Sequence, residues 1–249
     1  MTTLKDKKAL VLGASSGIGR ATLEALASQG MQVCGVARDR ERLERITREA
    51  PGRVTAQAGD ATSAAFVEEL IHAWDPDLVV LCTGVHPRLA RIDEHTWESF
   101  SAPWHADVKA TFVLGQAALR TPMRSGTRVV IVSSGAAIAG SPMSGGYAGS
   151  KRTQWFMSTY LQSVSDARGL GIRFNVVVPR QLVAGTEIAE DASRAYAQTT
   201  GQDQATYMKR FGTPLMADGV AAAILAIARG DEGTQHAALA VTGEGVAAL

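Results

Sequence analysis

The sequence contains few cysteines and aromatic residues, and neither sign of charge is in excess. Cys34 and Cys82 are the only cysteines among 249 residues. Two widely separated cysteines exclude a disulfide framework and a zinc cluster, and we expect both to be small buried side chains. The five histidines are scattered, so we expect no metal site. The formal net charge is +1, which excludes a nucleic-acid-binding surface spread over the whole protein.

Long hydrophobic runs are also missing. The apolar stretch over residues 219–228 is about half as long as the ~20 residues that a membrane span needs. The first residues are charged and contain no apolar signal-peptide segment. Apolar residues make up 46% of the chain and charged residues 20%, which is typical of a folded protein. We therefore expect a cytoplasmic protein without a membrane segment.

Short apolar runs alternate with amphipathic stretches along the chain. The expected strands cover residues 8–12, 32–37, 54–58, 77–82, 128–133, 172–178 and 238–241. The expected helices cover residues 18–28, 39–49, 63–73, 104–119, 147–168 and 215–229, with one or two helical turns at 95–103. This alternation predicts an α/β fold, a single doubly wound parallel sheet of about seven strands with helices on both faces.

We expect residues 1–249 to form a single domain, which is within the size range of α/β folds. Residues 180–213 are polar and show no strand pattern. We expect one or two short helices there, forming a lid over a ligand site.

A glycine-rich turn, GASSGIG, joins the first expected strand to the first expected helix. Glycines let the backbone turn sharply and approach a pyrophosphate, and the helix N-terminus offers free amides. The alternative is an ordinary tight loop. The residues expected to hold a dinucleotide here are Gly13, Ser15, Ser16, Gly17, Ile18 and Gly19.

The end of the second expected strand indicates which dinucleotide is bound. Ala37 stands where an acidic residue would bind the ribose 2′-hydroxyl of NAD, and Arg38 follows it. An arginine suits the 2′-phosphate of NADP, so we expect NADP(H) rather than NAD(H). Asp39 is the alternative residue that could bind the ribose, although its position suits an N-cap of the next helix.

Other expected cofactor contacts also lie at strand ends, where ligands of such sheets bind. They are Asp60 and Ala61 after the third strand, Gly84 after the fourth and Pro179 after the sixth. Asp60 is placed to reach the adenine edge, or alternatively to cap the helix that starts at Ser63.

Tyr147 and Lys151 stand four residues apart at the start of a long expected helix, so their side chains share one face. A neighbouring ammonium favours the phenolate, which makes a general acid/base suited to alcohol–carbonyl interconversion. Ser134 ends the fifth expected strand and is placed to hydrogen-bond a substrate oxygen. Ser133 is the less favoured candidate for this role.

Together these motifs resemble the short-chain dehydrogenase/reductase family. The glycine turn, Asp60, Ser134 and Tyr147-x-x-x-Lys151 occur in the family's order over nearly the whole chain, and Ser134 precedes Tyr147 by the usual 13 residues. The resemblance implies a Rossmann sheet and hydride transfer from NADPH to a carbonyl. Tyr147 would give the proton, Ser134 would hold the oxygen, and Lys151 would bind the nicotinamide ribose.

The resemblance also implies dimers or tetramers packed through the helices at 104–119 and 147–168. Trp155, Phe156 and Leu161 fit either such an interface or the core.

Three positions depart from the family pattern. Residues 81–84 are Leu-Cys-Thr-Gly instead of Asn-Asn-Ala-Gly. Asp107 stands where the family has an asparagine that holds a water of the proton relay. Three outcomes are open: Asp107 sustains that relay, slows it or binds Lys151. Arg180 replaces a glycine after Pro179. It either meets an anionic substrate group or pairs with Glu187 or Asp191.

The substrate pocket is expected to be largely apolar, which suits a hydrophobic ketone or secondary alcohol. Its expected contacts are Ala136, Ile138, Met143, His86, Arg180, Tyr196, Met208 and Phe211. His86 is either a second acid or an ordinary loop residue.

The sequence leaves two other functions open. One is a non-catalytic NADP-binding sensor or scaffold of the same fold, since a fold does not fix a function. The other is a different reaction, such as epimerisation, with the same tyrosine. We expect a small-molecule partner and no nucleic acid.

Overall fold

The computed structural model describes residues 3–249, so the first two residues of the expected domain lie outside it. An eight-stranded sheet runs in the order β10-β9-β6-β5-β4-β1-β2-β3. Its strands are β1 Lys8–Leu12, β2 Gln32–Ala37, β3 Arg53–Ala58, β4 Leu78–Leu81, β5 Arg128–Val132, β6 Arg173–Pro179, β9 Ala238–Thr242 and β10 Gly245–Ala248. All neighbours pair in parallel except β10, which is antiparallel to β9. The expected doubly wound α/β fold is confirmed.

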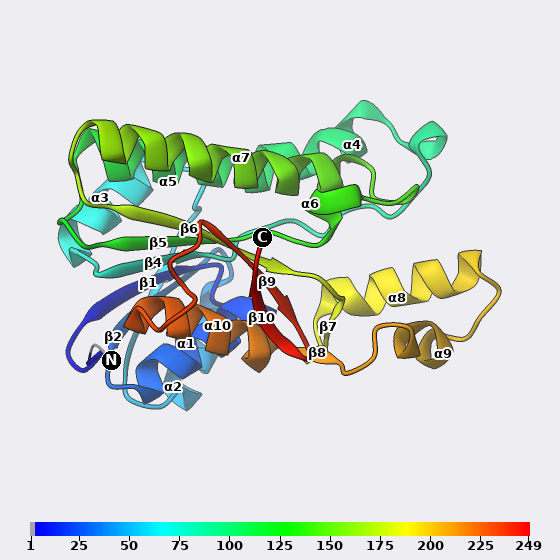
Figure 1. Ribbon diagram of the computed structural model, residues 1–249, viewed down its shortest axis with the longest axis horizontal. Helices are drawn as coiled ribbons and strands as arrows, with labels where there is room; N and C mark the ends of the chain where they lie inside the picture. The colour runs from blue at the N-terminus through cyan, green and yellow to red at the C-terminus, as the bar shows by residue number, and fades with distance from the viewer. Residues whose placement is uncertain (1–2) are drawn as a thin grey trace.

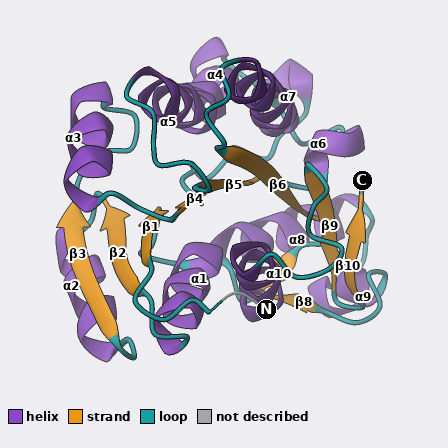
Figure 2. Cartoon of the chain, turned by 60° about the vertical axis from the view of Figure 1, so that its left-hand side comes forward, coloured by secondary structure: helices purple, strands orange, loops and turns teal. Residues whose placement is uncertain are grey.

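Helices cover both faces of the sheet. Figure 1 shows α3, α5 and α7 above the sheet and α1, α2 and α10 below it, and Figure 2 shows the same two layers from another side. These helices are α1 Gly17–Ser28, α2 Arg40–Glu49, α3 Ala64–Trp74, α5 Lys109–Arg120, α7 Gly146–Ala167 and α10 Ala217–Arg229. The layers explain why the central strands are apolar on both sides.

Alternate residues of a strand face opposite layers. In β1, Ala9 and Val11 pack into the core cluster that includes α1 and α10. Leu10 and Leu12 pack into the cluster that includes α3 and α5. All four side chains are at most 1% exposed, so the sheet is anchored through two cores rather than one.

The number of strands differs from the expectation of about seven. The eighth strand, β10, follows β9 through a hairpin at Gly243 and Glu244. Every residue of β10 is exposed, although its sequence Gly-Val-Ala-Ala is largely apolar. The strand is short and lies at the edge of the sheet, and it was not predicted.

A π-helical turn interrupts the helix expected at 104–119. The segment is α4 Trp97–Pro103, then the π turn η2 Trp104–Val108, then α5. Turns of this kind contain one extra residue and are frequent at functional sites. This one contains Asp107.

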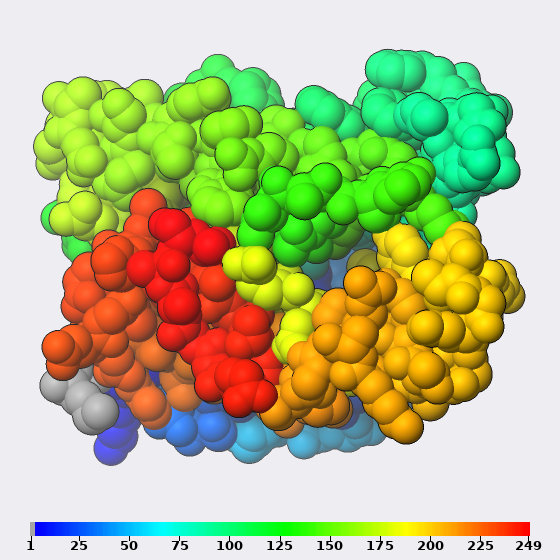
Figure 3. All heavy atoms as spheres, turned by 45° about the vertical axis from the view of Figure 1, so that its right-hand side comes forward, coloured from blue at the N-terminus to red at the C-terminus, as the bar shows by residue number. Residues whose placement is uncertain are grey.

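Residues 180–213 form the lid-like projection at the right of Figure 1. They contain β7 Val183–Ala184, α8 Glu187–Thr199 and α9 Gln204–Lys209. The two short helices were expected, whereas the strand was not. β7 pairs with β8 Leu215–Met216, which the sequence assigned to the start of α10. Figure 3 shows a hollow between this projection, in yellow and orange, and the green segment around α6 Ala136–Ala139.

No helix within residues 3–249 has the length and apolar character needed to cross a membrane.

Candidate active site

The glycine-rich turn is too tight for larger residues. Gly13 and Gly17 have φ angles of +92° and +48°, in the left-handed region. A Cβ atom on Gly13 would lie 2.7 Å from the amide nitrogen of Thr83. A Cβ on Gly19 would collide with the carbonyl of Gly13. The turn therefore depends on glycine at these positions.

The start of α1 is suited to an anion. Ser16 is its N-cap in an extended conformation, and within the described part of the chain its side chain makes no capping hydrogen bond. The first amides of a helix need partners, and a phosphate can provide them. Ser15, Ser16 and Ile18 are half-buried here. These residues fit the pyrophosphate of a dinucleotide.

Arg38 and Asp60 lie at the neighbouring strand ends. Arg38 is exposed just after β2, and Asp39 caps α2 by accepting a hydrogen bond from the amide of Arg42 at 2.9 Å. The Asp60 carboxylate accepts from the amide of Thr62 at 2.8 Å. This bond forms a turn before α3, so the alternative role of Asp60 as a cap at Ser63 is not observed.

The hydrogen bond from Thr62 is the main cause that lowers the pKa of Asp60, and the positive charge of Arg38 adds to it. Asp60 is therefore an ionised acceptor near the expected adenosine site. Ala61, beside it, is buried.

Lys151 lies in a buried ion pair with Asp107. Its Nζ is 3.1 Å from Asp107 Oδ2, and the two side chains are 8% and 0% exposed. Lys151 Nζ also donates to the carbonyl of Val132 at 3.3 Å. The same Nζ lies 5.7 Å from the ring centre of Tyr147. The predicted Tyr147–Lys151 pair is thus brought together, with a carboxylate on the other side of the ammonium.

The charge of Asp107 decides the ionisation of Lys151. Burial lowers the pKa of Lys151, but the opposing charge of Asp107, followed by that of Tyr147, outweighs burial and raises the pKa above its ordinary value. Lys151 therefore carries its proton at neutral pH. Among the outcomes that the sequence left open for Asp107, the structure shows direct contact with Lys151.

Two other oxygens of Asp107 also accept hydrogen bonds. Its Oδ1 accepts from the amide of Val85 at 3.2 Å, which ties the π turn to the chain just after Gly84. Its backbone carbonyl accepts from Thr111 Oγ1 at 2.9 Å and from Gln154 Nε2 at 3.1 Å. Both of these donors are buried, so protein groups already satisfy that carbonyl.

The two serines at the end of β5 differ in their surroundings. Ser133 is buried, and its Oγ donates to the carbonyl of Lys151 at 2.9 Å, which fixes α7 against the sheet. Ser134 is half-buried, and its Oγ accepts from the amide of Ala136 at 3.2 Å. Accepting one bond leaves the Ser134 hydroxyl hydrogen free to donate, which agrees with preferring Ser134 over Ser133. Pro179 lies next to this loop, since its carbonyl accepts from Gly135 at 2.7 Å.

Cys82, which replaces an asparagine of the family pattern, follows β4 directly. Burial raises the pKa of Cys82 to about 12, although the charge of Lys151 opposes this. The side chain therefore stays a neutral thiol. Cys34 is buried within β2, as expected.

The expected substrate contacts fall into separate groups. Ala136 and Ile138 lie in α6, and the amide of Met143 donates to Ser141 Oγ. Tyr196 of α8 hydrogen-bonds the same Ser141 through its hydroxyl, so it links the lid to the loop before α7. Sequence reasoning did not single out Ser141.

Met208 and Phe211 line a cavity of about 340 Å³ inside the lid, between α8, α9 and β7. The residues that line it include neither Ser134 nor Tyr147. These two expected substrate contacts therefore line a cavity formed within residues 182–215.

Within residues 3–249, Arg180 does not form the ion pair with Glu187 or Asp191 that was one of its two expected roles. Arg180 is exposed, and its expected partners Glu187 and Asp191 instead face His86 at 3.4 and 3.6 Å. Glu187 also pairs with Arg42 at 3.1 Å. These contacts join segments far apart in the chain, so no local pattern could have predicted them.

Comparisons with known proteins agree with this architecture. The profile of the short chain dehydrogenase family matches residues 7–197. The uncharacterized oxidoreductase YghA of Escherichia coli is 29% identical over 221 residues, which cover 85% of this chain and 74% of that protein. An uncharacterized oxidoreductase of Mycobacterium tuberculosis is 31% identical over 231 residues, covering 90% of this chain and 86% of the relative.

A solved structure is similar over almost the whole chain. It is a short chain dehydrogenase from Burkholderia cenocepacia in complex with NADP, with 26% identity and a TM-score of 0.79. The match covers 97% of this chain and 98% of the other. With the family profile spanning the glycine turn, Ser134, Tyr147 and Lys151, these similarities show that the chain is an oxidoreductase of the short-chain dehydrogenase family.

Proposed function

We propose that this protein is an NADP(H)-dependent oxidoreductase that interconverts a ketone or aldehyde and the corresponding alcohol. The observation that carries the proposal is the buried Lys151 ammonium, 5.7 Å from the ring centre of Tyr147. A proton donor beside a fixed positive charge is what a carbonyl needs when it gains negative charge during reduction.

In this proposal Tyr147 is the general acid/base. Its hydroxyl protonates the carbonyl oxygen during reduction and removes the alcohol proton in the reverse direction. Ser134 donates a hydrogen bond to the same oxygen. Lys151 binds the nicotinamide ribose and stabilises the charged form of Tyr147. The bound nicotinamide would supply or accept the hydride.

The residues around the glycine turn would hold the cofactor. The amides at the start of α1 are available to the pyrophosphate, and Gly84 and Pro179 border the nicotinamide end. Arg38 is exposed at the carboxyl end of β2, where the adenosine ribose is expected. A guanidinium there favours the 2′-phosphate, and the NADP complex of the Burkholderia relative supports this choice.

The proposed substrate is a small, hydrophobic carbonyl compound. Ala136 and Ile138 of α6, with Met143, are the proposed apolar contacts, since α6 borders the hollow seen in Figure 3. Ile138 is 42% exposed, so it is available to a ligand.

We also propose a homo-oligomer that packs through α5 and α7. Large apolar side chains are exposed on these helices: Phe112, Phe156, Tyr160 and Val164. The sequence did not decide whether Trp155, Phe156 and Leu161 belong to an interface or to the core. In the structure Trp155 and Leu161 pack against the core, whereas Phe156 is 44% exposed. Exposed aromatic side chains of this kind mark interaction surfaces.

The test is oxidation of NADPH with a panel of hydrophobic ketones and aldehydes, for the wild type and Tyr147→Phe. We expect the variant to lose turnover while its affinity for NADPH, measured by fluorescence titration, stays nearly unchanged. Turnover that survives in a folded Tyr147→Phe protein would exclude this tyrosine as the acid.

One observation favours a second candidate, a non-catalytic NADP-binding sensor. The carboxylate of Asp107 neutralises the charge of Lys151, which weakens the support that the ammonium gives to Tyr147. A protein that binds NADPH but turns over no carbonyl compound, with the same affinity after Tyr147→Phe, would support this candidate.

A further inference from the structure

The N-terminal end of the lid helix α8 lies directly over the glycine-rich turn. A Cβ atom placed on Gly17 would meet Thr186 Cγ2 at 3.3 Å. Thr186 is the N-cap of α8, and its side chain accepts from the amide of Ala189. The start of this helix therefore shares space with the part of the cofactor site that holds phosphate groups.

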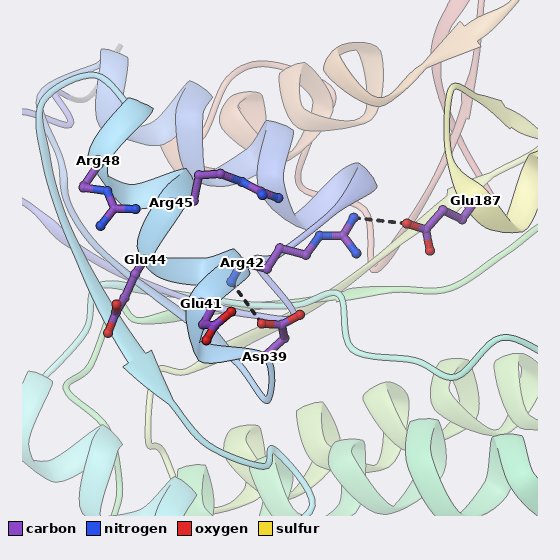
Figure 4. Close-up of a pocket in the computed structure, with 7 residues that line it drawn as sticks. All are labelled: Asp39, Glu41, Arg42, Glu44, Arg45, Arg48 and Glu187. Atoms are coloured by element: carbon purple, nitrogen blue, oxygen red, sulfur yellow. Dashed lines mark hydrogen bonds and ion pairs between the residues drawn. The ribbon is translucent and has the colours of Figure 1, made fainter.

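An ion pair connects the lid helix to the opposite side of the cofactor site. Arg42 Nη2 of α2 lies 3.1 Å from Glu187 Oε1 of α8, although the two residues are 145 positions apart in the sequence. Figure 4 shows the Arg42 side chain reaching across toward Glu187. The side chains are 37% and 60% exposed, so solvent and ligands reach both.

Arg42 lies where a 2′-phosphate would be expected. It belongs to the first turn of α2, the helix that follows β2, and Arg38 lies just before that helix. The adenosine ribose of a dinucleotide meets the carboxyl end of this strand. Arginine binds phosphate through two parallel hydrogen bonds, which a carboxylate partner also uses.

Arg42 also lines a hollow of about 600 Å³ together with Arg45 and Arg48. Acidic side chains border the same hollow, but two of them are already engaged. Asp39 accepts the amide of Arg42, and Glu44 pairs with Arg40 at 2.7 Å. Of the acidic side chains that border the hollow, Glu187 is the one that forms an ion pair with the Arg42 guanidinium.

Glu187 would keep a partner if Arg42 left it. His86, in the loop after β4, has Nε2 3.4 Å from Glu187 Oε2 and Nδ1 3.6 Å from Asp191 Oδ2. Asp191 in turn pairs with Arg194 at 3.3 Å. Because Glu187 is 60% exposed, water can also solvate its carboxylate once Arg42 has moved to the phosphate.

We propose that Glu187 is an internal competitor of the cofactor 2′-phosphate for Arg42, so that Glu187 sets the preference between NADP and NAD. NADP must displace this carboxylate before Arg42 can bind its phosphate, whereas NAD has no group that needs Arg42. The displacement also breaks the ion pair between α8 and α2. The inference rests on the proposed binding of NADP at this site.

The experiment measures the dissociation constants of NADP⁺ and NAD⁺ by calorimetry. The proteins are the wild type, Glu187→Gln, Arg42→Gln and the double variant. Glu190→Gln is the matched control, because it removes the same charge from the same helix and Glu190 makes no ion pair within residues 3–249. An exposed ion pair of this kind changes an affinity by about twofold to fivefold.

We expect Glu187→Gln to bind NADP⁺ about twofold to fivefold more tightly, with little change for NAD⁺ or in the control. The gain should vanish in the background of Arg42→Gln. An equal gain for both nucleotides, or a gain that persists without Arg42, would overturn the inference.

The outcomes also separate this inference from the proposed function. A wild type that binds both nucleotides equally, and still does so after Glu187→Gln, would overturn the NADP preference and the competition together. An NADP⁺ preference that Arg38→Ala removes, but that Glu187→Gln leaves unchanged, would overturn the competition alone.

Discussion

Replacing Asp107 with asparagine is the most informative change in this protein. The substitution keeps the size of the side chain and an oxygen that can accept from the amide of Val85, 3.2 Å away from Oδ1. It removes the charge that faces Lys151. The variant therefore isolates the electrostatic effect of Asp107 from its packing.

The size of the expected change in stability follows from the geometry of the ion pair. At a separation of 3.1 Å, two unit charges attract by about 5 kcal/mol at an effective dielectric constant near 20. The desolvation of two buried ions offsets much of this attraction, but losing one partner leaves the other charge uncompensated. We expect Asp107→Asn to lower the free energy of unfolding by about 2 kcal/mol, and Tm by about 4–8 °C.

The direction of the pKa shift of Lys151 determines how the stabilisation by this ion pair changes with pH. The pKa of Lys151 is raised above its ordinary value of 10.5. A raised pKa means that the folded state holds this proton more tightly, so the pair stabilises the fold fully below pH 10.5. The stabilisation is lost as pH rises through the folded-state pKa. The gap in stability between wild type and variant should therefore be full at neutral pH and shrink only in strong alkali.

The expected effect on activity is opposite in direction. Without the carboxylate, burial lowers the pKa of Lys151, but the positive charge that Lys151 keeps acts on Tyr147 without a competing anion, so turnover at neutral pH should be preserved or raised. Thermal unfolding and kcat are measured side by side, with the exposed Asp166→Asn in α7 as the control. A collapse of kcat in a well-folded variant would refute this reasoning, because it would show that the reaction needs the carboxylate.

Four other substitutions test the rest of the site. Arg38→Ala should weaken NADPH binding about tenfold or more, with a much smaller loss for NADH in parallel titrations; equal losses would exclude a 2′-phosphate contact. Ser134→Ala should lower kcat by about 10²–10³ with an unchanged Tm. Ser133→Ala should instead lower stability by about 1–3 kcal/mol in denaturant unfolding, because the carbonyl of Lys151 loses its donor. Gly19→Ala should reduce Tm and nucleotide affinity together, since the new methyl group meets the carbonyl of Gly13; an unchanged Tm would mean that the turn can relax.

Much of the fold could be predicted because the central strands are buried on both faces. The expected strand at 32–37 coincides with β2, and that at 8–12 with β1. The glycine turn and the Tyr147–Lys151 pair could be predicted for a similar reason, since their geometry is local. Backbone turns and i,i+4 contacts depend on residues close together in the chain.

The features that were missed depend on long-range contacts or on weak local patterns. β10 is an exposed strand, so periodicity gives no signal for it. The pairing of Glu187 with Arg42 depends on how the lid docks onto α2, which no short segment determines. For Asp107, the sequence left three outcomes open, one of them binding to Lys151, and the fold shows that its carboxylate contacts Lys151.

The π turn η2 makes the position of Asp107 sensitive to chain length. A π turn holds one residue more than an α-helical turn, and each residue of an α-helix adds about 100° of rotation. Deleting one residue within Trp104–Val108 would restore a regular α-helix. The segment before the deletion would then rotate by about 100° relative to α5, and its side chains would leave their present neighbours. The contact between the helix and Lys151 therefore depends on the one extra residue of the π turn as well as on the identity of residue 107.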